Sequence, residues 1–578
     1  MNKIKIILFF IILFVIAFAQ PAKTIPKKPD KKKSDIKNSK TIFSNTESAE
    51  EYLKVLERAL QLLKTNYVDS LNESEMVISA IKGLMKNLDP YTKLLMDQAK
   101  EGYDDLRKGK FGGIGIYIGM RRDTLTVLGT IENSPAYSEG IQIGDNILMI
   151  DSTYTKNLTI KECTGLMRGE LDSLVTLTIY RSATKEKIEF DLTRANIPLK
   201  NVPYWGINED GIGYIRINRF SRNSDKDFKE GLKYFKDNEL NGLIIDLRGN
   251  SGGLLSAGIN ILDYLTDRGE ELLIQKGKTP RSNQTWKSRR SPILDLDIPL
   301  VVLINRKSAS ASEIVAGTIQ DLDRGIIVGE KSYGKGLVQH MYDLNDTTTL
   351  KVTTAKFYLP SGRLIQKQDY LDNGFLTDGL DKRDSVFTTK NGRIVKGGGG
   401  IEPDILSNRN SYSPFVNALF KEKVFLTFAS DYIPRNPDIK EKLEQKLILP
   451  DKVFNDFKQF LYGYNLKYKL VGEIDFEKMK RKILNESISI NKNSRLISHT
   501  PPYDMVNELD KYFNIIKDIQ IYLPDNEVAV KNGLLREFCR ILFNEKKKIE
   551  VSLINDITYN RAVEILKDKN EYYQLLDY

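Results

Sequence analysis

Three serines in the segment Ser308-Ala309-Ser310-Ala311-Ser312-Glu313 could supply a nucleophile. They follow a short apolar run at residues 300–304 that predicts a strand buried on both faces, and they precede a helix predicted over 311–322. A hydroxyl at such a strand-to-helix turn lies at the carboxyl edge of the sheet, where α/β proteins bind their ligands. One serine could therefore cap the helix while another acts as a nucleophile.

A serine nucleophile needs a base, and the composition restricts the choice. The chain has 578 residues but two histidines, His340 and His499, and His499 falls in a remote helical region. His340 alone could complete a Ser-His-Asp triad. Lys335 is the better candidate, because its glycine neighbours let the backbone approach other elements and a desolvated lysine can be neutral enough to accept a proton. The residues indicate a Ser/Lys hydrolase, and they leave open that Lys335 is a surface charge in a turn.

Two glycine-rich segments invite a nucleotide-binding interpretation that the sequence does not support. Residues 329–336 nearly match a phosphate-binding loop, but Gly336 replaces the hydroxyl residue that would hold magnesium, and residues 337–344 predict a strand where a helix is required. Residues 248–253 lack the glycine spacing of a dinucleotide site. Because they lie between a predicted strand and a predicted helix, their amides could instead meet an anion, including a transient oxyanion.

A chain of 578 residues is longer than one hydrophobic core can serve, so we expect several domains. Its contents of 41% apolar and 28% charged residues are typical of globular proteins. Apolar spacing predicts helices over 51–63, 77–88, 254–265, 311–322 and 534–542, and strands over 111–119, 125–129, 147–150, 175–180, 243–247 and 300–304. The expected parts are an N-terminal helical region (46–109), a β-rich module (110–196), an α/β core (197–408) and a C-terminal helical domain (409–578).

The start of the chain predicts export. Lys3 and Lys5 precede an apolar run over residues 6–19 that ends in Ala17-Phe18-Ala19, a cleavage signature. At ~1.5 Å per residue this run falls short of the roughly 30 Å hydrocarbon core. We therefore expect a signal peptide at 1–19 and a location in the periplasm or cell envelope, with an uncleaved inner-membrane anchor through residues 6–19 as the alternative.

The charge distribution limits the partners. Of the net charge of +10, the first 41 residues supply +8, which leaves a near-neutral body and argues against a nucleic-acid-binding fold. Residues 20–45 predict a basic disordered tether that could associate with an anionic membrane surface. The two cysteines, Cys163 and Cys539, and the two histidines predict neither a disulfide framework nor a zinc cluster. No metal or cofactor is expected.

Several motifs in fixed order resemble the C-terminal processing peptidases, also called tail-specific proteases. They are Leu-Asp-Pro-Tyr-Thr at 88–92, the module at 111–181, the segments 308–313 and 329–339, Lys-Val-Thr-Thr-Ala-Lys at 351–356, Pro-Ser-Gly-Arg at 360–363 and Gly-Ile-Glu-Pro-Asp at 400–404. The resemblance implies a serine endopeptidase that cuts exported proteins or peptides near unstructured C-termini, without metal or ATP. It also implies a ClpP/crotonase-like α/β protease core.

The resemblance assigns roles by position. It makes Ser310 the nucleophile, Lys335 its general base and Gln339 the residue that orients the lysine. The amides of Gly253 and Ala311 match the oxyanion hole. Asp321 matches an acidic position of the family, to which we give a supporting role.

The same resemblance identifies residues 110–196 as a PDZ domain inserted before the α/β core. In Gly112-Gly113-Ile114-Gly115, the amides of Gly113, Ile114 and Gly115 would receive a terminal carboxylate while the substrate adds as a strand. Ser134-Pro135-Ala136 and residues 140–145 match the other landmarks of the module. The expected fold is thus multidomain α/β and β, with a helical hairpin before the PDZ domain and a helical domain after the core.

The sequence leaves two alternatives open. One is a non-catalytic PDZ scaffold that binds chain termini without cutting them, which the presence of both Ser310 and Lys335 disfavours. The other is a signal-peptide-degrading Ser/Lys peptidase, which the PDZ module disfavours. The expected partners are proteins or peptides with accessible C-termini, and a homodimer or an adaptor is compatible with the long C-terminal segment.

Overall fold

The computed structural model describes residues 49–86, 88–121, 123–367, 385–407, 412–493 and 503–576. The chain divides into two compact units, Met1–Ala80 and Ile81–Tyr578. The expected signal peptide (1–19) and tether (20–45) lie outside the described residues. Within the described ranges, no helix is long and apolar enough to cross a membrane.

The first unit contains helix α2 (Ala49–Asn66) and the beginning of helix α3 (Glu73–Met85). These helices confirm the prediction of two helices here, although α3 begins earlier than expected and ends before Leu88. Acidic residues in the first turn and a lysine in the last turn of each helix complement the helix dipole.

The β-rich module has a sheet of order β3-β4-β5-β7-β8, with β6 paired to β5 and a separate β2–β9 pair. The strand expected over 111–119 is divided in two, because Gly115 has φ +79° and interrupts the extended chain. Helix α5 (Pro135–Ser138) is capped by the side chain of Ser134. The remaining elements are β2 (Lys110–Gly113), β3 (Ile116–Arg121), β4 (Thr124–Thr130), β5 (Asn146–Ile150), β6 (Thr153–Tyr154), α6 (Ile160–Met167), β7 (Leu174–Arg181), β8 (Glu186–Thr193) and β9 (Ala195–Pro198).

The central sheet of the core has the order β10-β11-β12-β15-β16-β21, and all of its neighbours are parallel except β10 and β11. The expected strands are confirmed as β12 (Gly242–Asp246) and β15 (Leu300–Ile304), and the expected helices as α8 (Leu255–Asp263) and α9 (Ala311–Asp321). The other elements are β10 (Tyr204–Ile207), β11 (Ile212–Arg216), α7 (Ser224–Lys236), β16 (Ile326–Gly329) and β21 (Ile405–Leu406).

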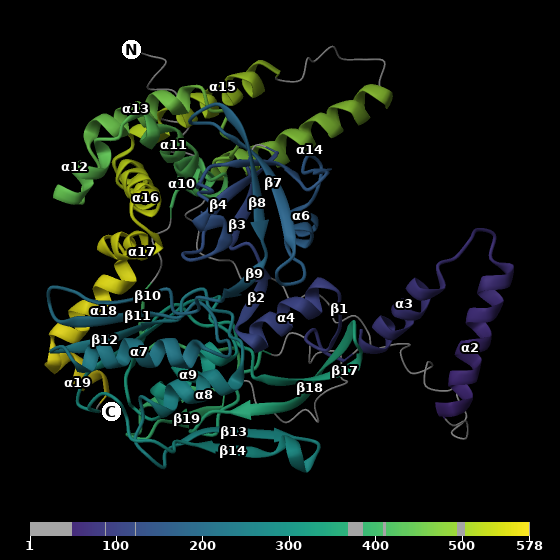
Figure 1. The fold of residues 1–578 in the computed structure, drawn as a ribbon, viewed down its shortest axis with the longest axis vertical. Coiled ribbons are helices and arrows are strands. Elements are labelled where there is room, and N and C mark those ends of the chain that lie inside the picture. The colour runs from purple at the N-terminus through teal and green to yellow at the C-terminus, as the bar shows by residue number, and fades with distance from the viewer. Residues whose placement is uncertain are drawn as a thin grey trace. The chain divides into compact units, whose positions relative to one another are not determined.

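Side chains of β15 alternate between two apolar cores, which explains why the strand is apolar throughout. Val302 and Ile304 face the core formed with helices α7, α8 and α9, whereas Val301 and Leu303 face the opposite one. The second core is closed by the end of the chain, namely α17 (Glu545–Ile554), α18 (Ile557–Lys567) and α19 (Lys569–Leu576) (Figure 1). The core is therefore a three-layer α/β/α arrangement, and its outer layer comes from the segment expected to be a C-terminal helical domain.

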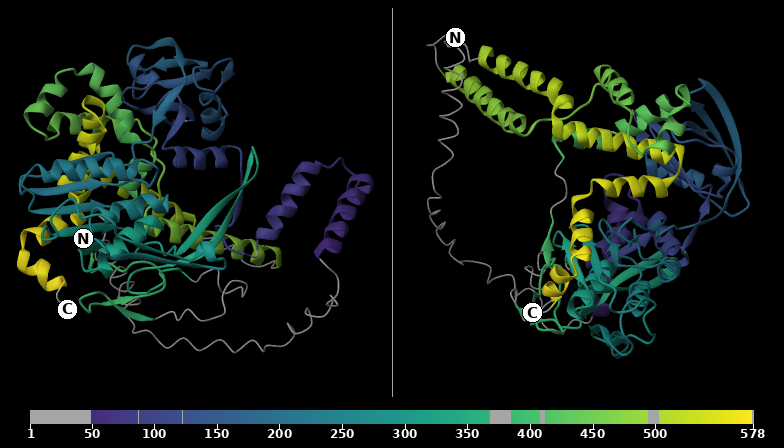
Figure 2. Two further views of the ribbon diagram at one scale, coloured as in Figure 1. Left: turned by 60° about the horizontal axis from the view of Figure 1, so that its bottom comes forward. Right: turned by 90° about the vertical axis from the view of Figure 1, so that its left-hand side faces the viewer.

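A second sheet lies in the core region, with order β1-β18-β13-β14 and β17 paired to β18. The strand expected over 337–344 is confirmed as β17, which forms a long antiparallel pair with β18 (Figure 2). Strand β1 pairs with β18 and so brings the preceding residues 88–92 next to that strand. The elements are β1 (Lys93–Met96), α4 (Gln98–Lys108), β13 (Glu271–Gly277), β14 (Gln284–Lys287), β17 (Leu337–Asn345), β18 (Thr348–Tyr358), β19 (Val386–Thr388) and β20 (Ile394–Lys396).

The remaining helices of the C-terminal segment form a core of their own that is rich in phenylalanine. Gly533 lets α16 approach this core, because a Cβ there would lie 2.6 Å from the ring of Phe425. Cys539 is buried in the same cluster and Cys163 in the β-rich module, and both are free thiols. The helices are α10 (Pro414–Lys421), α11 (Val424–Tyr432), α12 (Ile439–Gln445), α13 (Asp451–Tyr462), α14 (Val471–Asn493), α15 (Tyr503–Ile519) and α16 (Pro524–Leu542), the last of which includes the helix expected over 534–542.

Candidate active site

Three neighbouring parallel strands of the central sheet carry the candidate catalytic residues in the loops at their carboxyl ends. Strand β15 pairs with β12 on one side and with β16 on the other. Gly253 follows β12, Ser310 follows β15 and Lys335 follows β16. Because parallel strands end at the same edge of a sheet, the fold places these three residues on one edge.

Ser310 differs from its two neighbouring serines in backbone conformation. It has φ +57° and ψ −115°, a strained conformation for a residue with a side chain, and it lies at a sharp turn from strand to helix α9. Such a turn is where α/β hydrolases present a nucleophile. The hydroxyls of Ser308 and Ser312 are buried and donate to the carbonyls of Leu247 and Asn250, over 2.9 and 2.8 Å. These two serines hold the turn that carries Ser310.

The buried carboxylate of Glu313 joins the nucleophile turn to the lysine loop. Its Oε2 accepts from the amides of Ser310 (2.7 Å) and Lys335 (2.9 Å), and its Oε1 accepts from the amide of Gly334 (2.6 Å) and the hydroxyl of Ser332 (2.5 Å). Burial raises the pKa of Glu313, whereas these hydrogen bonds act to lower it. No role was predicted for Glu313 from the sequence, although a glutamate three residues after a serine at a helix start is the pattern of a capping box.

Lys335 is half-buried, and its surroundings make the neutral amine easier to form than for a lysine in water. Burial lowers its pKa to about 8, and the like charge of Lys351 acts in the same direction, while Glu313 and Asp89 act to raise it. The Nζ atom lies 4.9 Å from the centre of the Tyr91 ring. A lysine with this pKa can exchange a proton with a hydroxyl near neutral pH.

Tyr91 belongs to a tight turn formed by the motif at residues 88–92. Asp89 Oδ1 accepts from the amides of Tyr91 (2.8 Å) and Thr92 (2.9 Å), and its Oδ2 accepts from the Thr92 hydroxyl (2.6 Å). The Thr353 hydroxyl of β18 also donates to Asp89 (3.1 Å). The turn therefore positions Tyr91 and Asp89 near Lys335, a role that was not predicted for either residue.

Gln339 and His340 lie next to each other on β17 and point to opposite faces of the strand. The side-chain nitrogen Nε2 of Gln339 donates to the Thr353 hydroxyl over 3.5 Å, which links Gln339 to the Asp89 turn. Its hydrogen bonds within the described residues do not include one to Lys335, so its orienting role stays a prediction. His340 is exposed and packs against the Tyr342 ring, with centres 5.1 Å apart. His499 lies outside the described residues.

Glycines 252 and 253 pass directly beside the nucleophile turn. A Cβ at Gly252 would lie 2.9 Å from Cβ of Ser310, and one at Gly253 would lie 1.9 Å from the carbonyl oxygen of Phe220. Both residues have positive φ, so only glycine fits this path. Ala311 is the first residue of α9, and its amide is therefore one of those that a helix leaves without an intrahelical partner. The roles of Gly253 and Ala311 as oxyanion donors stay predictions.

Asp321 is not part of this cluster, because it lies at the far end of helix α9, about 16 Å along the axis from Ser310. It forms a buried ion pair with Arg363 (2.7 Å) and accepts from the amide of Ser361 (3.0 Å). Burial raises the pKa of Asp321, and Arg363 acts against this shift. Asp321 thus anchors the turn at residues 360–363.

Across the described ranges, no cluster of three His, Cys, Asp or Glu residues could hold a metal ion.

A second candidate site lies in the β-rich module, at the connection between β2 and β3. The carbonyls of Ile114 and Gly115 accept from the amides of Ala136 (3.0 Å) and Ile131 (2.8 Å). In the described part of the chain, neither the Ile114 nor the Gly115 amide donates a hydrogen bond, whereas Gly113 pairs with Ala195 in the β2–β9 ladder. Strand β3 is an edge strand and α6 packs beside it. An open strand edge next to such amides is suited to an extended chain end with a terminal carboxylate.

Comparison with known proteins assigns all four parts of the chain. The family described as "Peptidase family S41" matches residues 211–374, and "PDZ domain" matches residues 112–192. "Probable PDZ-protease, C-terminal helical domain" matches residues 415–566, and "Activating protease CtpB N-terminal domain" matches residues 15–100.

Two relatives agree with these families. The carboxy-terminal-processing protease of Bartonella bacilliformis is 34% identical over 308 residues, which cover 53% of this chain and 70% of the relative. The carboxyl-terminal-processing protease of Synechocystis is 34% identical over 313 residues, which cover 53% of this chain and 72% of the relative. Among solved structures, a photosystem II D1 C-terminal processing protease matches with 24% identity and a TM-score of 0.33, over 63% of this chain and 94% of that protein. The protein is therefore a serine peptidase with a PDZ domain and belongs to the carboxy-terminal processing proteases of peptidase family S41.

Proposed function

We propose that the protein is an exported endopeptidase that cleaves proteins or peptides near their C-termini through a dyad of Ser310 and Lys335. The observation that carries this proposal is the shared bond of both residues to Glu313, which ties the nucleophile turn to the lysine loop. The strained backbone of Ser310 and the lowered pKa of Lys335 support the same assignment.

In the proposed reaction, neutral Lys335 accepts the proton of the Ser310 hydroxyl as its oxygen attacks the carbonyl carbon of the scissile peptide bond. The amides of Gly253 and Ala311 donate to the oxyanion that forms. The Lys335 ammonium then gives its proton to the departing amine nitrogen, and an ester of Ser310 remains. Neutral Lys335 next accepts a proton from a water molecule that attacks this ester. Lys335 then gives that proton back to the Ser310 oxygen as the ester bond breaks and the new carboxylic acid is released.

The PDZ domain would hold the substrate by its C-terminus. The terminal carboxylate would accept from the amides of Gly113, Ile114 and Gly115, and the residues before it would pair with the edge of β3. The open amides of Ile114 and Gly115 support this binding mode. For Gly113 the ladder with β9 competes, so we expect the other two amides to contribute more.

Cleavage by serine variants tests the function. A purified protein with an unfolded apolar C-terminal tail is the substrate, and its fragments are followed by mass. We expect Ser310→Ala to abolish cleavage, while Ser308→Ala and Ser312→Ala keep activity at a reduced level because they lose a hydrogen bond of about 1 kcal/mol that supports the turn. If Ser312→Ala proved inactive and Ser310→Ala active, the choice of nucleophile would be wrong.

Cleavage of this substrate, of its C-terminally amidated form and of isolated signal peptides distinguishes the proposal from the two alternatives. A non-catalytic scaffold would bind the tail without producing fragments, even though the chain belongs to a peptidase family. A signal-peptide-degrading peptidase would cleave isolated signal peptides and would not distinguish a free C-terminus from an amidated one. We expect cleavage that depends on the free C-terminus.

Export remains part of the proposal, together with membrane-surface association of residues 20–45 and with assembly as a homodimer or with an adaptor. The cleavage signature at Ala17-Phe18-Ala19 supports release after Ala19 into the periplasm or cell envelope. N-terminal sequencing of the mature protein is expected to begin at Gln20. A start at Met1 in the membrane fraction would replace cleavage with anchoring through residues 6–19.

A further inference from the structure

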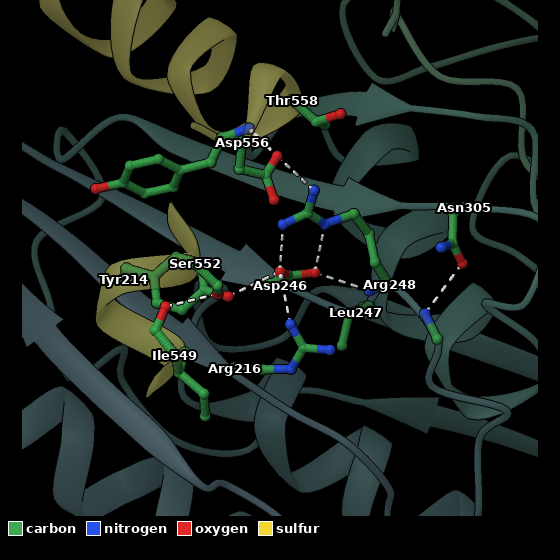
Figure 3. Close-up of polar contacts among 12 residues, drawn as sticks. Tyr214, Arg216, Asp246, Leu247, Arg248, Asn305, Ile549, Ser552, Asp556 and Thr558 are labelled. Carbon is green, nitrogen blue, oxygen red and sulfur yellow. Dashed lines mark hydrogen bonds and ion pairs between the residues drawn. The ribbon is translucent and has the colours of Figure 1, made fainter. Parts of the chain in front are cut away.

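A buried charge cluster lies at the start of the loop that leads to Gly253. Asp246, the last residue of β12, is fully buried, and Arg248 folds back on it with Nε at 3.0 Å and Nη2 at 2.7 Å from its two carboxylate oxygens. The Tyr214 hydroxyl donates to Asp246 over 2.8 Å, and a guanidinium nitrogen of Arg216 lies 3.5 Å away (Figure 3). Burial acts to raise the pKa of Asp246, but Arg248 and Arg216 hold it at about 2. The carboxylate is therefore charged at any physiological pH.

The fourth charge of the cluster comes from the end of the chain. Nη1 of Arg248 donates to Oδ1 of Asp556 over 2.8 Å, on the opposite side of the guanidinium from Asp246 (Figure 3). The same oxygen of Asp556 accepts from the amide of Tyr559 (3.0 Å) and caps helix α18. The cluster thus contains two carboxylates and two guanidiniums. Without Asp556, one positive charge at Arg248 would lack a counter-charge in a largely buried place.

The loop that begins at Arg248 supports the nucleophile turn. Two residues after Arg248, the carbonyl of Asn250 accepts from the amide of Ala309 (3.1 Å) and the hydroxyl of Ser312 (2.8 Å), on either side of Ser310. The side-chain oxygen of Asn250 accepts from the amide of Gly252 (2.9 Å). A change in the path of this loop would therefore move the Gly252–Gly253 segment relative to Ser310.

We infer that Asp556 is a positioning residue, which through Arg248 lets helix α18 hold residues 248–253 in the path that the oxyanion site requires. The inference rests on the proposed function, because it takes Ser310 as the nucleophile and the Gly253 amide as an oxyanion donor. It gives the last helices of the chain a part in catalysis besides covering the sheet. Because neither Asp556 nor Arg248 is among the residues assigned to substrate binding or to the reaction, the pair should affect kcat and leave KM and binding at the PDZ domain unchanged.

The test compares Asp556→Ser with Asp568→Ser in the full mature chain. Serine is a good helix N-cap, so Asp556→Ser keeps the cap of α18 but is too short to reach Arg248. Asp568 accepts from the amides of Asn570 and Glu571 at the start of α19, so Asp568→Ser is the same change at a cap that does not contact the loop. The readouts are kcat, KM and inhibition by a peptide boronate, whose tetrahedral adduct with a serine needs the oxyanion site.

We expect Asp556→Ser to lower kcat and boronate affinity by about tenfold, less than the loss from removing an oxyanion donor outright. KM should stay unchanged, and Asp568→Ser should match the wild type. An Asp556→Ser enzyme with wild-type kcat, or an equal loss in Asp568→Ser, would overturn the inference. If Asp556→Ser does not fold, Asp556→Asn replaces it in the test, because asparagine keeps the shape of the side chain and the helix cap. We expect Asp556→Asn to show a smaller loss of kcat at constant KM. A wild-type kcat in Asp556→Asn would also overturn the inference.

The proposed function is checked separately in the same assay by Ser310→Ala. If Ser310→Ala still cleaves, the dyad itself is wrong. If Ser310→Ala is inactive while Asp556→Ser has wild-type kcat, only the positioning role fails.

Discussion

The amides of Ser310 and Lys335 donate to the same oxygen, Oε2 of Glu313, over 2.7 and 2.9 Å. The two residues follow different strands of the sheet, and this shared acceptor ties their loops together. The spacing of nucleophile and base therefore depends on a side chain that does not itself need to react. It also places a carboxylate near Lys335, where it acts to raise the pKa of that lysine.

We expect Glu313→Gln to impair catalysis in two distinguishable ways. One carboxylate oxygen becomes an NH2 group, so the amides of either Ser310 and Lys335 or the groups at Ser332 and Gly334 lose their acceptor. The variant should lose stability by about 1–3 kcal/mol and lose at least about tenfold in plateau activity. Because the negative charge is removed, the midpoint of its pH profile should also move to lower pH.

Glu330→Gln is the matched control for this variant. Glu330 pairs with Arg306 near the surface and does not contact Ser310 or Lys335. The Glu330→Gln variant should keep the wild-type plateau activity and the wild-type midpoint of the pH profile. Wild-type kinetics in Glu313→Gln would contradict the role given to Glu313.

Removing the charge of Lys351 should shift the pH profile in the opposite direction. The like charge of Lys351 helps to lower the pKa of Lys335, so in Lys351→Met this pKa should rise above about 8. A base must be neutral to act, so kcat/KM near pH 7 should fall while the plateau at high pH is kept. Lys356→Met, on the same strand, controls for loss of a lysine from β18. A midpoint that stays in place or falls would show that Lys351 does not tune the base.

Peptide binding at the PDZ domain should require a free terminal carboxylate, which can be tested by titration calorimetry with the Ser310→Ala variant. Loss of charge-assisted hydrogen bonds should weaken binding of the C-terminal amide by about 1.5–3 kcal/mol, or at least tenfold. Equal affinities for acid and amide would rule out this binding mode.

Gly115→Ala should weaken binding of the same peptide, because Gly115 has φ +79° and a Cβ there would lie 2.1 Å from the Ser134 side chain. Gly140→Ala is the control, since Gly140 has φ +83° but a Cβ there would meet nothing within 4 Å. Both variants place a side chain at a positive φ, so a greater loss of binding in Gly115→Ala would report the displacement at Gly115 beside Ser134 and not backbone strain alone. Identical binding by the two variants would place the carboxylate elsewhere.

Two of the three strands that carry the site, β12 and β15, were predicted, because a residue run such as 300–304 is apolar throughout only when both faces of a strand are buried. Strand β16, which precedes Lys335, was not predicted. The distinction of Ser310 from Ser308 and Ser312 was not available from spacing, since it lies in a backbone angle and in hydrogen bonds to Leu247 and Asn250. It came from the family resemblance.

Roles that depend on long-range contacts could not be read from local pattern. Asp89 meets Thr353 of β18, and Arg248 meets Asp556, and neither pair is adjacent in sequence. The same holds for α17–α19, whose apolar faces predict helices but do not indicate that they cover the central sheet. A helical pattern specifies the buried face of a helix and not the surface that buries it.

The pH dependence of kcat/KM for the wild type, Lys335→Arg and His340→Ala tests the central claim most directly. The fraction of neutral Lys335 is roughly a tenth at pH 7 if its pKa is about 8, so activity should rise with pH through about 8 and then reach a plateau. Lys335→Arg should be inactive, because a guanidinium stays protonated at any usable pH. His340→Ala should keep the wild-type profile, because His340 is exposed. An inactive His340→Ala beside an active Lys335→Arg would contradict the Ser/Lys dyad and establish a histidine-based mechanism.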